Sequence, residues 1–177
     1  MCGLFGLLCY GDKVDNLNEI IKELAHASAE RGTDATGLAY VSNGRLTVYK
    51  KAASAYKLQY RLPKDVTWVV GHTRHATQGK KEFAANNHPF IGKVKNNAFA
   101  LAHNGVLTND DMLKRQYRLP KTKIETDSYV AVQLLEHKNK LDFDSLKFMA
   151  EEVMGSFSFS VMDKDNNLYL VKGDSTL

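Results

Sequence analysis

The segment TGLAYVSNGRLTVYKK, residues 36–51, contains two runs of alternating apolar and polar residues on either side of Asn43 and Gly44. Asn-Gly favours a two-residue type I′ turn, because both residues tolerate a positive φ. Alternation with a period of two is typical of a strand that buries one face. The segment therefore predicts a β-hairpin, and a hairpin implies an antiparallel sheet.

Other strands are expected on both sides of this hairpin. The opening CGLFGLLCY, residues 2–10, is an apolar run of strand length and predicts a buried strand. Further strands are predicted at VTWVVGH (66–72), AFALAHNG (98–105), GSFSFSVMD (155–163) and LYLVKG (168–173), the last two joined by a turn at KDNN.

Helical periodicity is clearest in residues 15–32. The face formed by Leu17, Ile20, Ile21, Leu24, Ala25 and Ser28 follows an Asp15/Asn16 cap, and Gly32 provides a stop. Residues 106–116 also predict a helix, and residues 126–138 and 142–153 predict amphipathic helices. The polar stretch 73–89 shows no periodicity and predicts a long loop, and loops of this length are usually functional or mobile.

The order of these elements combines hairpins with grouped helices, which favours a layered α+β fold over a doubly wound parallel sheet. We expect one domain over residues 1–177, because no linker, internal repeat or low-complexity tract interrupts the chain. A chain of this length buries roughly 70% of its unfolded surface, which is enough for a substantial core.

Composition excludes several classes of protein. The net charge is +4, but the lysines are scattered along the chain and not gathered with aromatic residues, so we expect no nucleic-acid partner. No segment resembles a signal peptide or a membrane span. Cys2 and Cys9 lie seven residues apart in a predicted strand, which argues against a disulfide and for a reducing compartment. We therefore expect a cytoplasmic protein.

Cys2 is the residue whose position most needs explaining. If Met1 is removed, the thiol and the α-amino group share one carbon, and an amine with a pKa of about 8 can accept the thiol proton. Gly3 lets the backbone bend closely around such a site. The alternative is that Cys2 is simply a small apolar residue at the start of a strand.

Three further segments end or begin predicted elements with polar residues. Arg74 follows a strand, where its guanidinium suits bidentate capture of a carboxylate, although it can equally be a surface arginine. Asn104 and Gly105 can supply two donors to an oxyanion or form a plain turn. Asp127 is predicted in the first turn of a helix, where it complements the helix dipole or binds an ammonium group. Together with a terminal thiol, these residues could form a binding site for an amino acid with a side-chain amide.

Seven motifs follow one another over nearly the whole chain: CGLFG, ERGTDATG, GHTRHATQG, NNHPF, AHNGVLTN, ETDSYV and GSFSFSVMD. In these motifs and in their order the sequence resembles the class II glutamine amidotransferase domains of the N-terminal nucleophile hydrolases. The spelling of the motifs is most similar to that of the glutaminase domain of glucosamine-6-phosphate synthase.

The resemblance implies an αββα sandwich of two antiparallel sheets. It implies that Cys2 attacks the side-chain amide of L-glutamine, forms a γ-glutamyl thioester and releases ammonia before water hydrolyses the thioester. Asn104 and Gly105 would line the oxyanion hole. Arg74, with Thr77 beside it, would bind the α-carboxylate, and Asp127 would bind the α-ammonium group.

The resemblance also assigns supporting roles. Arg31 and Asp34 would brace the nucleophile strand beside Gly3 without touching substrate, and residues 73 to about 81 would form a lid over glutamine. No cofactor is implied. Ammonia would pass to an acceptor synthase domain or subunit, and no such domain is present in residues 1–177.

The sequence departs from the family in two places. His75 stands where the glucosamine-6-phosphate synthases carry a tryptophan near the ammonia channel, and KGDSTL (172–177) replaces an arginine and SPL pattern. The family's glutaminase domain generally continues beyond this point. The chain is therefore interpreted as a glutaminase domain that is either truncated at its C-terminus or a stand-alone subunit.

Several other readings compete with this one. His72 and His75 would face opposite sides of a strand, and His88 and His103 lack partners at metal-ligand spacing, so no metal site is expected. His88 is instead assigned to the wall of the substrate site. A Cys–His hydrolase using His103 leaves Arg74 unexplained. A terminal-cysteine amidohydrolase acting on another linear amide, or a silent binding domain of the same fold, stays open.

Overall fold

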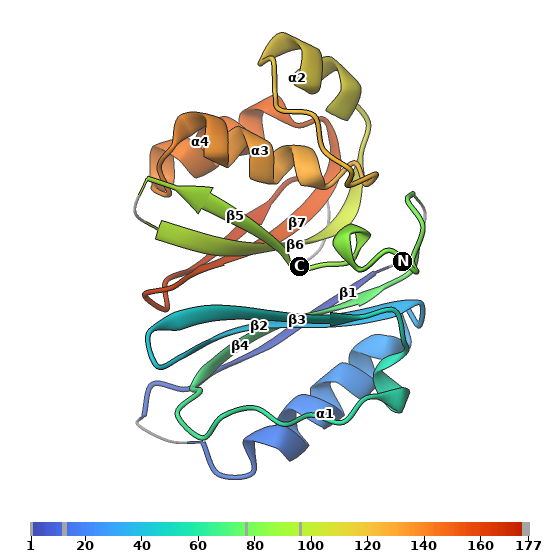
Figure 1. The fold of residues 1–177 in the computed structure, drawn as a ribbon, viewed down its shortest axis with the longest axis vertical. Coiled ribbons are helices and arrows are strands. Elements are labelled where there is room, and N and C mark those ends of the chain that lie inside the picture. The colour runs from blue at the N-terminus through green and yellow to red at the C-terminus, as the bar shows by residue number, and fades with distance from the viewer. Residues whose placement is uncertain (1, 12–13, 77, 96, 175–177) are drawn as a thin grey trace.

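The computed structural model describes residues 2–11, 14–76, 78–95 and 97–174. Two four-stranded antiparallel sheets lie face to face, and helices cover their outer faces (Figure 1). The strand order is β1-β4-β2-β3 in one sheet, called sheet A, and β5-β6-β7-β8 in the other, called sheet B. The predicted α+β sandwich of the αββα type is therefore confirmed.

Sheet A carries one helix, α1, on its outer face (Figure 1). Its elements are β1 (Gly3–Leu8), α1 (Leu17–Ala29), β2 (Ala35–Ser42), β3 (Arg45–Lys51), the short 3₁₀ helix η1 (Ala55–Lys57) and β4 (Trp68–Arg74). The turn between β2 and β3 follows the prediction, because Asn43 and Gly44 have φ values of 48° and 69°.

Sheet B is covered by α3 and α4, with α2 beyond them (Figure 1). Its elements are the 3₁₀ helix η2 (Ala84–Asn86), β5 (Phe90–Val94), β6 (Asn97–Leu107), α2 (Asp110–Gln116), α3 (Tyr129–Lys138), α4 (Phe143–Glu152), β7 (Gly155–Asp163) and β8 (Leu168–Lys172). The predicted hairpin between β7 and β8 is present, and Asp163 accepts the backbone N–H groups of Asp165 and Asn167 in its turn.

Five local expectations were wrong. The strand at residues 2–10 is not buried on both faces, because β1 lies at the edge of sheet A and alternate residues reach solvent. Ile20 is exposed, so the buried face of α1 is narrower than predicted. Gly32 does not end α1 through a positive φ. A Cβ there would lie 2.5 Å from the carbonyl carbon of Arg74, so this glycine allows close packing against the end of β4.

The other two differences concern sheet B. The sequence did not predict β5, although the residues of FIGKV alternate between buried and exposed in the structure. The helix α3 is not amphipathic, because residues 130–135 are all buried between sheet B and its neighbouring helices. A helix buried on all sides carries no helical periodicity for sequence analysis to find.

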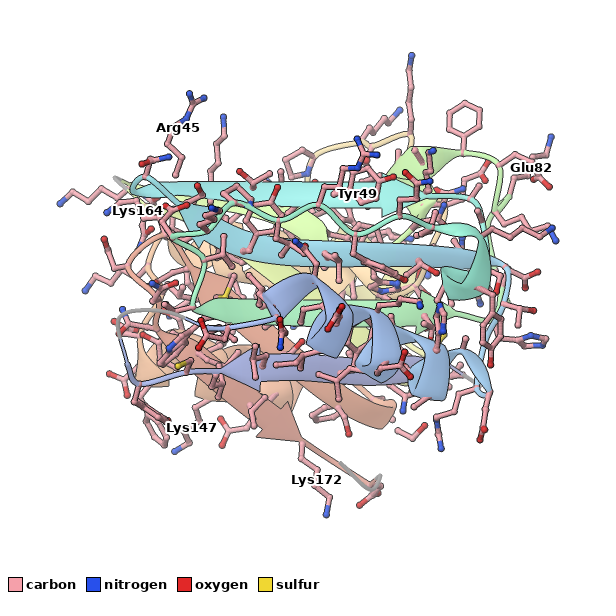
Figure 2. The ribbon with its side chains drawn as sticks, turned by 90° about the horizontal axis from the view of Figure 1, so that it is seen from below. Arg45, Tyr49, Glu82, Lys147, Lys164 and Lys172 are labelled. Carbon is pink, nitrogen blue, oxygen red and sulfur yellow. The ribbon has the colours of Figure 1, made fainter. Side chains whose placement is uncertain are left out.

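Charged side chains lie on several sides of the surface. Figure 2 shows the charged side chains of Arg45, Glu82 and Lys172 projecting away from the body of the molecule on different sides. None of the helices in the described ranges has the length and apolarity needed to span a bilayer.

Candidate active site

The antiparallel register of β1 and β4 brings the N-terminus to the end of β4. Gly3 pairs with Thr73, so Cys2 lies beside Arg74, one residue further along each strand. The Sγ atom of Cys2 is 3.6 Å from the backbone oxygen of His75. Two residues that are 72 positions apart in sequence thus meet at one edge of the sandwich.

Gly3 is required by close packing at this edge. A Cβ on Gly3 would lie 2.3 Å from Oγ of Ser28 and 2.7 Å from Oγ1 of Thr73. Thr73 in turn donates to the backbone oxygen of Ser28 at 2.7 Å, which ties α1 to β4. Only glycine lets the first strand lie this close to the helix behind it.

Arg31 contacts the nucleophile strand directly. Its Nε donates to the backbone oxygen of Cys2 at 2.9 Å. Arg31 follows α1, so its contact fixes the carbonyl of Cys2 from the helical side.

The thiol of Cys2 is half-buried and lies close to charged groups. Burial raises its pKa, while the hydrogen bond to His75 and the positive charge of Arg74 act in the opposite direction and the charge of Asp127 raises it further. A raised pKa keeps the thiol protonated near neutral pH, so nucleophilic attack would need a base to remove the proton.

Arg74 is almost fully buried at the end of β4 and is held by the loop that follows it. Its Nη1 donates to Oδ1 of Asn87 at 2.6 Å, and its Nη2 donates to the backbone oxygens of Gln78 and Gly79. Burial lowers its pKa, whereas Cys2, Asp34 and Asp127 act to raise it. A guanidinium has five N–H donors, so these contacts leave donors for a ligand.

Residues 75–89, called the site loop, are anchored on one side by Asp34. Its Oδ2 accepts the backbone N–H of Ala76 at 2.9 Å, and its Oδ1 accepts from Nζ of Lys81 at 2.8 Å. The hydrogen bond to Lys81 is the main cause that lowers the pKa of Asp34. Asp34 thus contacts the site loop. The resemblance had implied a different contact, with the nucleophile strand. Thr77, which was assigned to the α-carboxylate, lies outside the described residues.

The other anchor of the site loop is Glu125. Its Oε2 accepts from the backbone of Lys80 at 3.2 Å and from Nδ2 of Asn86 at 2.9 Å. Asn87, beside it, donates to the backbone oxygen of Lys81 while accepting from Arg74. The asparagine pair in NNHPF was the available sequence signal, and its role in holding the loop was missed.

Asn104 and Gly105 lie in β6, in the sheet that faces Arg74 and Cys2. Gly105 has a φ of 146°, and a Cβ there would lie 2.0 Å from the backbone oxygen of Ser156, so only glycine fits. Asn104 and Arg31 both border a cavity of about 410 Å³ between the sheets. The remaining lining comes from β1, β4, β7 and β8: Leu4, Phe5, Gly6, Leu8, Val69, Val70, Ser158, Ser160, Leu168 and Leu170.

Asp127 is buried between β6 and α3. It was predicted in the first turn of a helix, but α3 begins at Tyr129 and Ser128 is its N-cap. Its Oδ2 accepts the backbone N–H of Leu107 at 2.7 Å, and Oγ of Ser128 donates to its Oδ1 at 3.3 Å. The carboxylate therefore contacts the strand that carries Asn104 and lies directly before the N-terminus of α3.

Three buried histidines fill the interior beside these residues. The ring centroids of His72 and His88 are 4.3 Å apart, and those of His88 and His103 are 6.4 Å apart. Burial lowers the pKa of His72 to about 3 and that of His103 to about 4, and it lowers the pKa of His88 well below its ordinary value. All three are neutral near pH 7. Among the residues that the structure describes, no group of His, Cys, Asp and Glu is placed to hold a metal.

The assignment of His88 to the wall of the substrate site stays a prediction. Its ring is enclosed by His72 and by Phe90, whose ring centroid is 4.3 Å away. With the side chain almost fully buried, its described contacts are packing contacts within the sandwich.

The structure thus gathers Cys2, Arg74 and Asp127 within electrostatic range of one another. The predicted residues outside this group lie around it: Gly3 and Arg31 behind Cys2, Asp34 at the site loop, and Asn104 and Gly105 on β6.

Residues 72–176 match the family model described as a glutamine amidotransferase domain. This match covers more than half of the chain. The chain belongs to the glutamine amidotransferase family. Over its whole length it is 30% identical to the isomerizing glutamine–fructose-6-phosphate aminotransferase of Staphylococcus epidermidis and 31% identical to that of Staphylococcus aureus. In both alignments the chain covers 100% of itself and 30% of the relative, so this amidotransferase domain spans less than a third of those proteins.

Solved structures confirm the fold. The structure titled as the allosteric regulatory enzyme of purine biosynthesis superposes with a TM-score of 0.79 at 22% identity, covering 97% of this chain and 37% of that one. The glutamine phosphoribosylpyrophosphate amidotransferase from B. subtilis gives 0.71 at 23% identity, covering 92% and 35%. A class II glutamine amidotransferase domain, from a family of enzymes, is what the sequence motifs predicted, and that prediction is confirmed.

Proposed function

We propose that this glutamine amidotransferase domain hydrolyses L-glutamine to glutamate and ammonia through a thioester on Cys2. The observation that carries the proposal is the β1–β4 register, which sets the Cys2 thiol beside the buried Arg74 guanidinium. A nucleophile next to a buried cation, with a carboxylate nearby, suits a substrate that is itself a zwitterion.

In this proposal the two charged groups on the α-carbon of the substrate are bound by different residues. N–H donors of Arg74 that the described contacts do not use bind the α-carboxylate. Asp127 uses two of its lone-pair sites for Leu107 and Ser128, which leaves others for the α-ammonium group. Binding both charges directs the side-chain amide of the substrate towards the thiol.

The chemistry starts once Met1 has been removed and Cys2 carries a free α-amino group. The amine accepts the thiol proton, and sulfur attacks the amide carbon. Nδ2 of Asn104 and the backbone N–H of Gly105 stabilise the oxyanion that forms. The C–N bond breaks, the leaving nitrogen takes a proton from the ammonium group, and ammonia departs. Water then attacks the thioester and releases glutamate.

The ammonia would serve an acceptor. The curated relatives are named as aminotransferases that act with fructose 6-phosphate, and this chain matches 30% of their length. We propose that ammonia passes to an acceptor domain or partner outside the 177 residues.

The test is an ammonia-release assay on protein whose mature N-terminus has been verified by intact mass. We expect release from L-glutamine by the wild-type protein and none by Cys2→Ala. Cys9→Ala is the matched control, because Cys9 is also a half-exposed cysteine of the first strand region and forms no disulfide. Equal activity of Cys2→Ala and wild type would contradict the proposal, as would a wild-type protein with a free Cys2 amine that releases no ammonia.

A further inference from the structure

The carboxylate of Asp127, which we propose binds the ammonium group, is connected to both ends of the strand segment that carries the oxyanion donors. It bonds to one end directly and to the other end through Ser128. Leu107 donates to Oδ2 of Asp127 at 2.7 Å. On the other side, Oγ of Ser128 lies 3.3 Å from Oδ1 of Asp127 and 2.7 Å from Nδ1 of His103. His103 and Leu107 bracket Asn104 and Gly105, so the carboxylate is tied to both sides of that pair.

The direction of these hydrogen bonds follows from the number of protons available. A serine hydroxyl has one proton, and an ionised carboxylate only accepts. We assign the Ser128 proton to Asp127, to which Oγ donates at 3.3 Å, and His103 then donates from Nδ1 to the Ser128 oxygen at 2.7 Å. Burial lowers the pKa of His103 to about 4, so near neutral pH the ring carries one proton for this bond.

His103 is itself held in place by sheet A. Nε2 of His72, on β4, donates to the backbone oxygen of His103 at 3.0 Å. The ring of His103 packs on Phe159 with centroids 4.7 Å apart. His103, Ser128 and Asp127 are all almost fully buried. A buried chain joined by these hydrogen bonds has limited freedom to rearrange.

We propose that Ser128 and His103 are positioning residues for recognition of the substrate α-ammonium group, fixing the Asp127 carboxylate relative to the Asn104–Gly105 donors. Leu107 alone leaves the carboxylate free to pivot about one bond, whereas the second anchor through Ser128 fixes its plane. The inference rests on the proposed function and adds to it a cause for selecting an α-amino acid over its desamino analogue.

The test compares two substrates in Ser128→Ala. One is L-glutamine, and the other is 4-carbamoylbutanoate, which keeps the carboxylate and the amide but lacks the α-amino group. We expect kcat/KM for L-glutamine to fall about tenfold or more, in line with the loss of a hydrogen bond to a charged group. For the analogue we expect no change, because it has no ammonium group for Asp127 to bind. If its turnover is too slow to follow, its inhibition constant against L-glutamine provides the same comparison.

Ser145→Ala is the matched control. Ser145 is also a buried serine, and its Oγ donates to Oδ1 of Asp142 at 2.7 Å at the start of α4. Its substitution removes the same kind of bond away from the site, so the ratio of the two substrates should stay at the wild-type value. Thermal unfolding of each variant separates lost selectivity from lost folding.

Substitutions at His103 test the same bridge from its other end. The amide of Asn reaches the position of Nδ1 and can donate to Ser128, so His103→Asn should keep more of the preference for L-glutamine than His103→Leu. A wild-type protein that hydrolyses neither compound contradicts the proposed function and this inference together. The inference alone is overturned if the wild-type protein hydrolyses L-glutamine but Ser128→Ala and His103→Leu lower kcat/KM equally for both substrates, or for neither.

Discussion

The two layers of the sandwich differ in how firmly they are built. Sheet B and its helices share one large core, in which α3 is buried on all sides and Phe99, Phe159 and Leu134 are fully enclosed. Sheet A is covered by a single helix, and its buried residues divide into smaller clusters. The proposed oxyanion donors lie in the firmer layer, and the thiol and the arginine lie in the other.

This difference separates two tasks. Donors for a transition state must be fixed before the reaction, because their value lies in not having to reorganise. Arg74, which we propose binds the carboxylate, has loop carbonyls among its partners and can instead be adjusted with the site loop. We therefore expect changes in sheet B to act mainly on kcat and changes around the site loop to act mainly on KM.

The largest expected effect tests the difference in cores. Leu134→Ala removes a fully buried side chain from the interior helix α3, and we expect it to lower the free energy of unfolding by about 4 kcal/mol. Leu17→Ala removes a side chain at the first turn of α1, where the chain can relax around the gap, and should cost about 2 kcal/mol. Urea denaturation measures both. Equal losses would contradict the contrast between the layers.

The next effect tests the fixed donors. Asn104→Ala should lower kcat by about 10²–10³, which corresponds to about 3 kcal/mol of transition-state stabilisation, with little change in KM. Steady-state kinetics with L-glutamine provides the measurement. A rise in KM at unchanged kcat would show that Asn104 binds the ground state, and would remove it from the oxyanion hole.

Most of the framework was predictable from the sequence because it is encoded locally. The Asn43-Gly44 turn fixes a hairpin through positive φ, and the face of α1 follows from the period of its apolar residues. The prediction that Cys2 and Arg74 share a site came from their residue types and from the family resemblance, and not from any local pattern.

The parts that were missed depend on tertiary contacts. The strand β5 is five residues long and was hidden by the polar stretch before it, and α3 has no polar face. The bridging role of Ser128 exists only because β6 passes beside the start of α3, which no local pattern encodes. The burial of His88 could not be foreseen either, because sequence alone does not reveal which histidines lie in the interior.

The three buried histidines, His72, His88 and His103, make the free energy of unfolding depend on pH. Their pKa values are lowered in the folded protein, so between pH 6.5 and about 4 the unfolded chain binds protons that the native state does not. Stability is therefore complete above the unfolded pKa and falls as pH decreases. Lowering the pH from 7 to 6 should cost about 2 kcal/mol for the three groups together.

Denaturation curves at a series of pH values measure this loss. His88→Phe keeps a ring between His72 and Phe90 and should reduce the pH dependence by one proton of the three. A wild-type protein whose stability is constant from pH 7 to pH 5 would show that these histidines are protonated in the folded state.

The smallest effect concerns the site loop. Lys81→Met removes the ion pair with Asp34, in which the lysine is about half exposed, so the loss in stability should be small. We expect a few-fold rise in KM for L-glutamine at unchanged kcat. Lys147→Met, which breaks the exposed pair with Glu151 on α4, is the control and should leave KM unchanged. A fall in kcat with Lys81→Met would place the site loop in the chemical step.

The central claim is that Cys2 is an activated nucleophile facing a site for a zwitterionic amino acid. It is tested most directly by treating the mature protein with the glutamine analogue in which a diazoketone replaces the amide, and mapping the adduct by peptide mass spectrometry. The account predicts one adduct on Cys2, protected by L-glutamine and absent in Cys2→Ala. An adduct on Cys9, or labelling of Cys2 that L-glutamine does not slow, would contradict it.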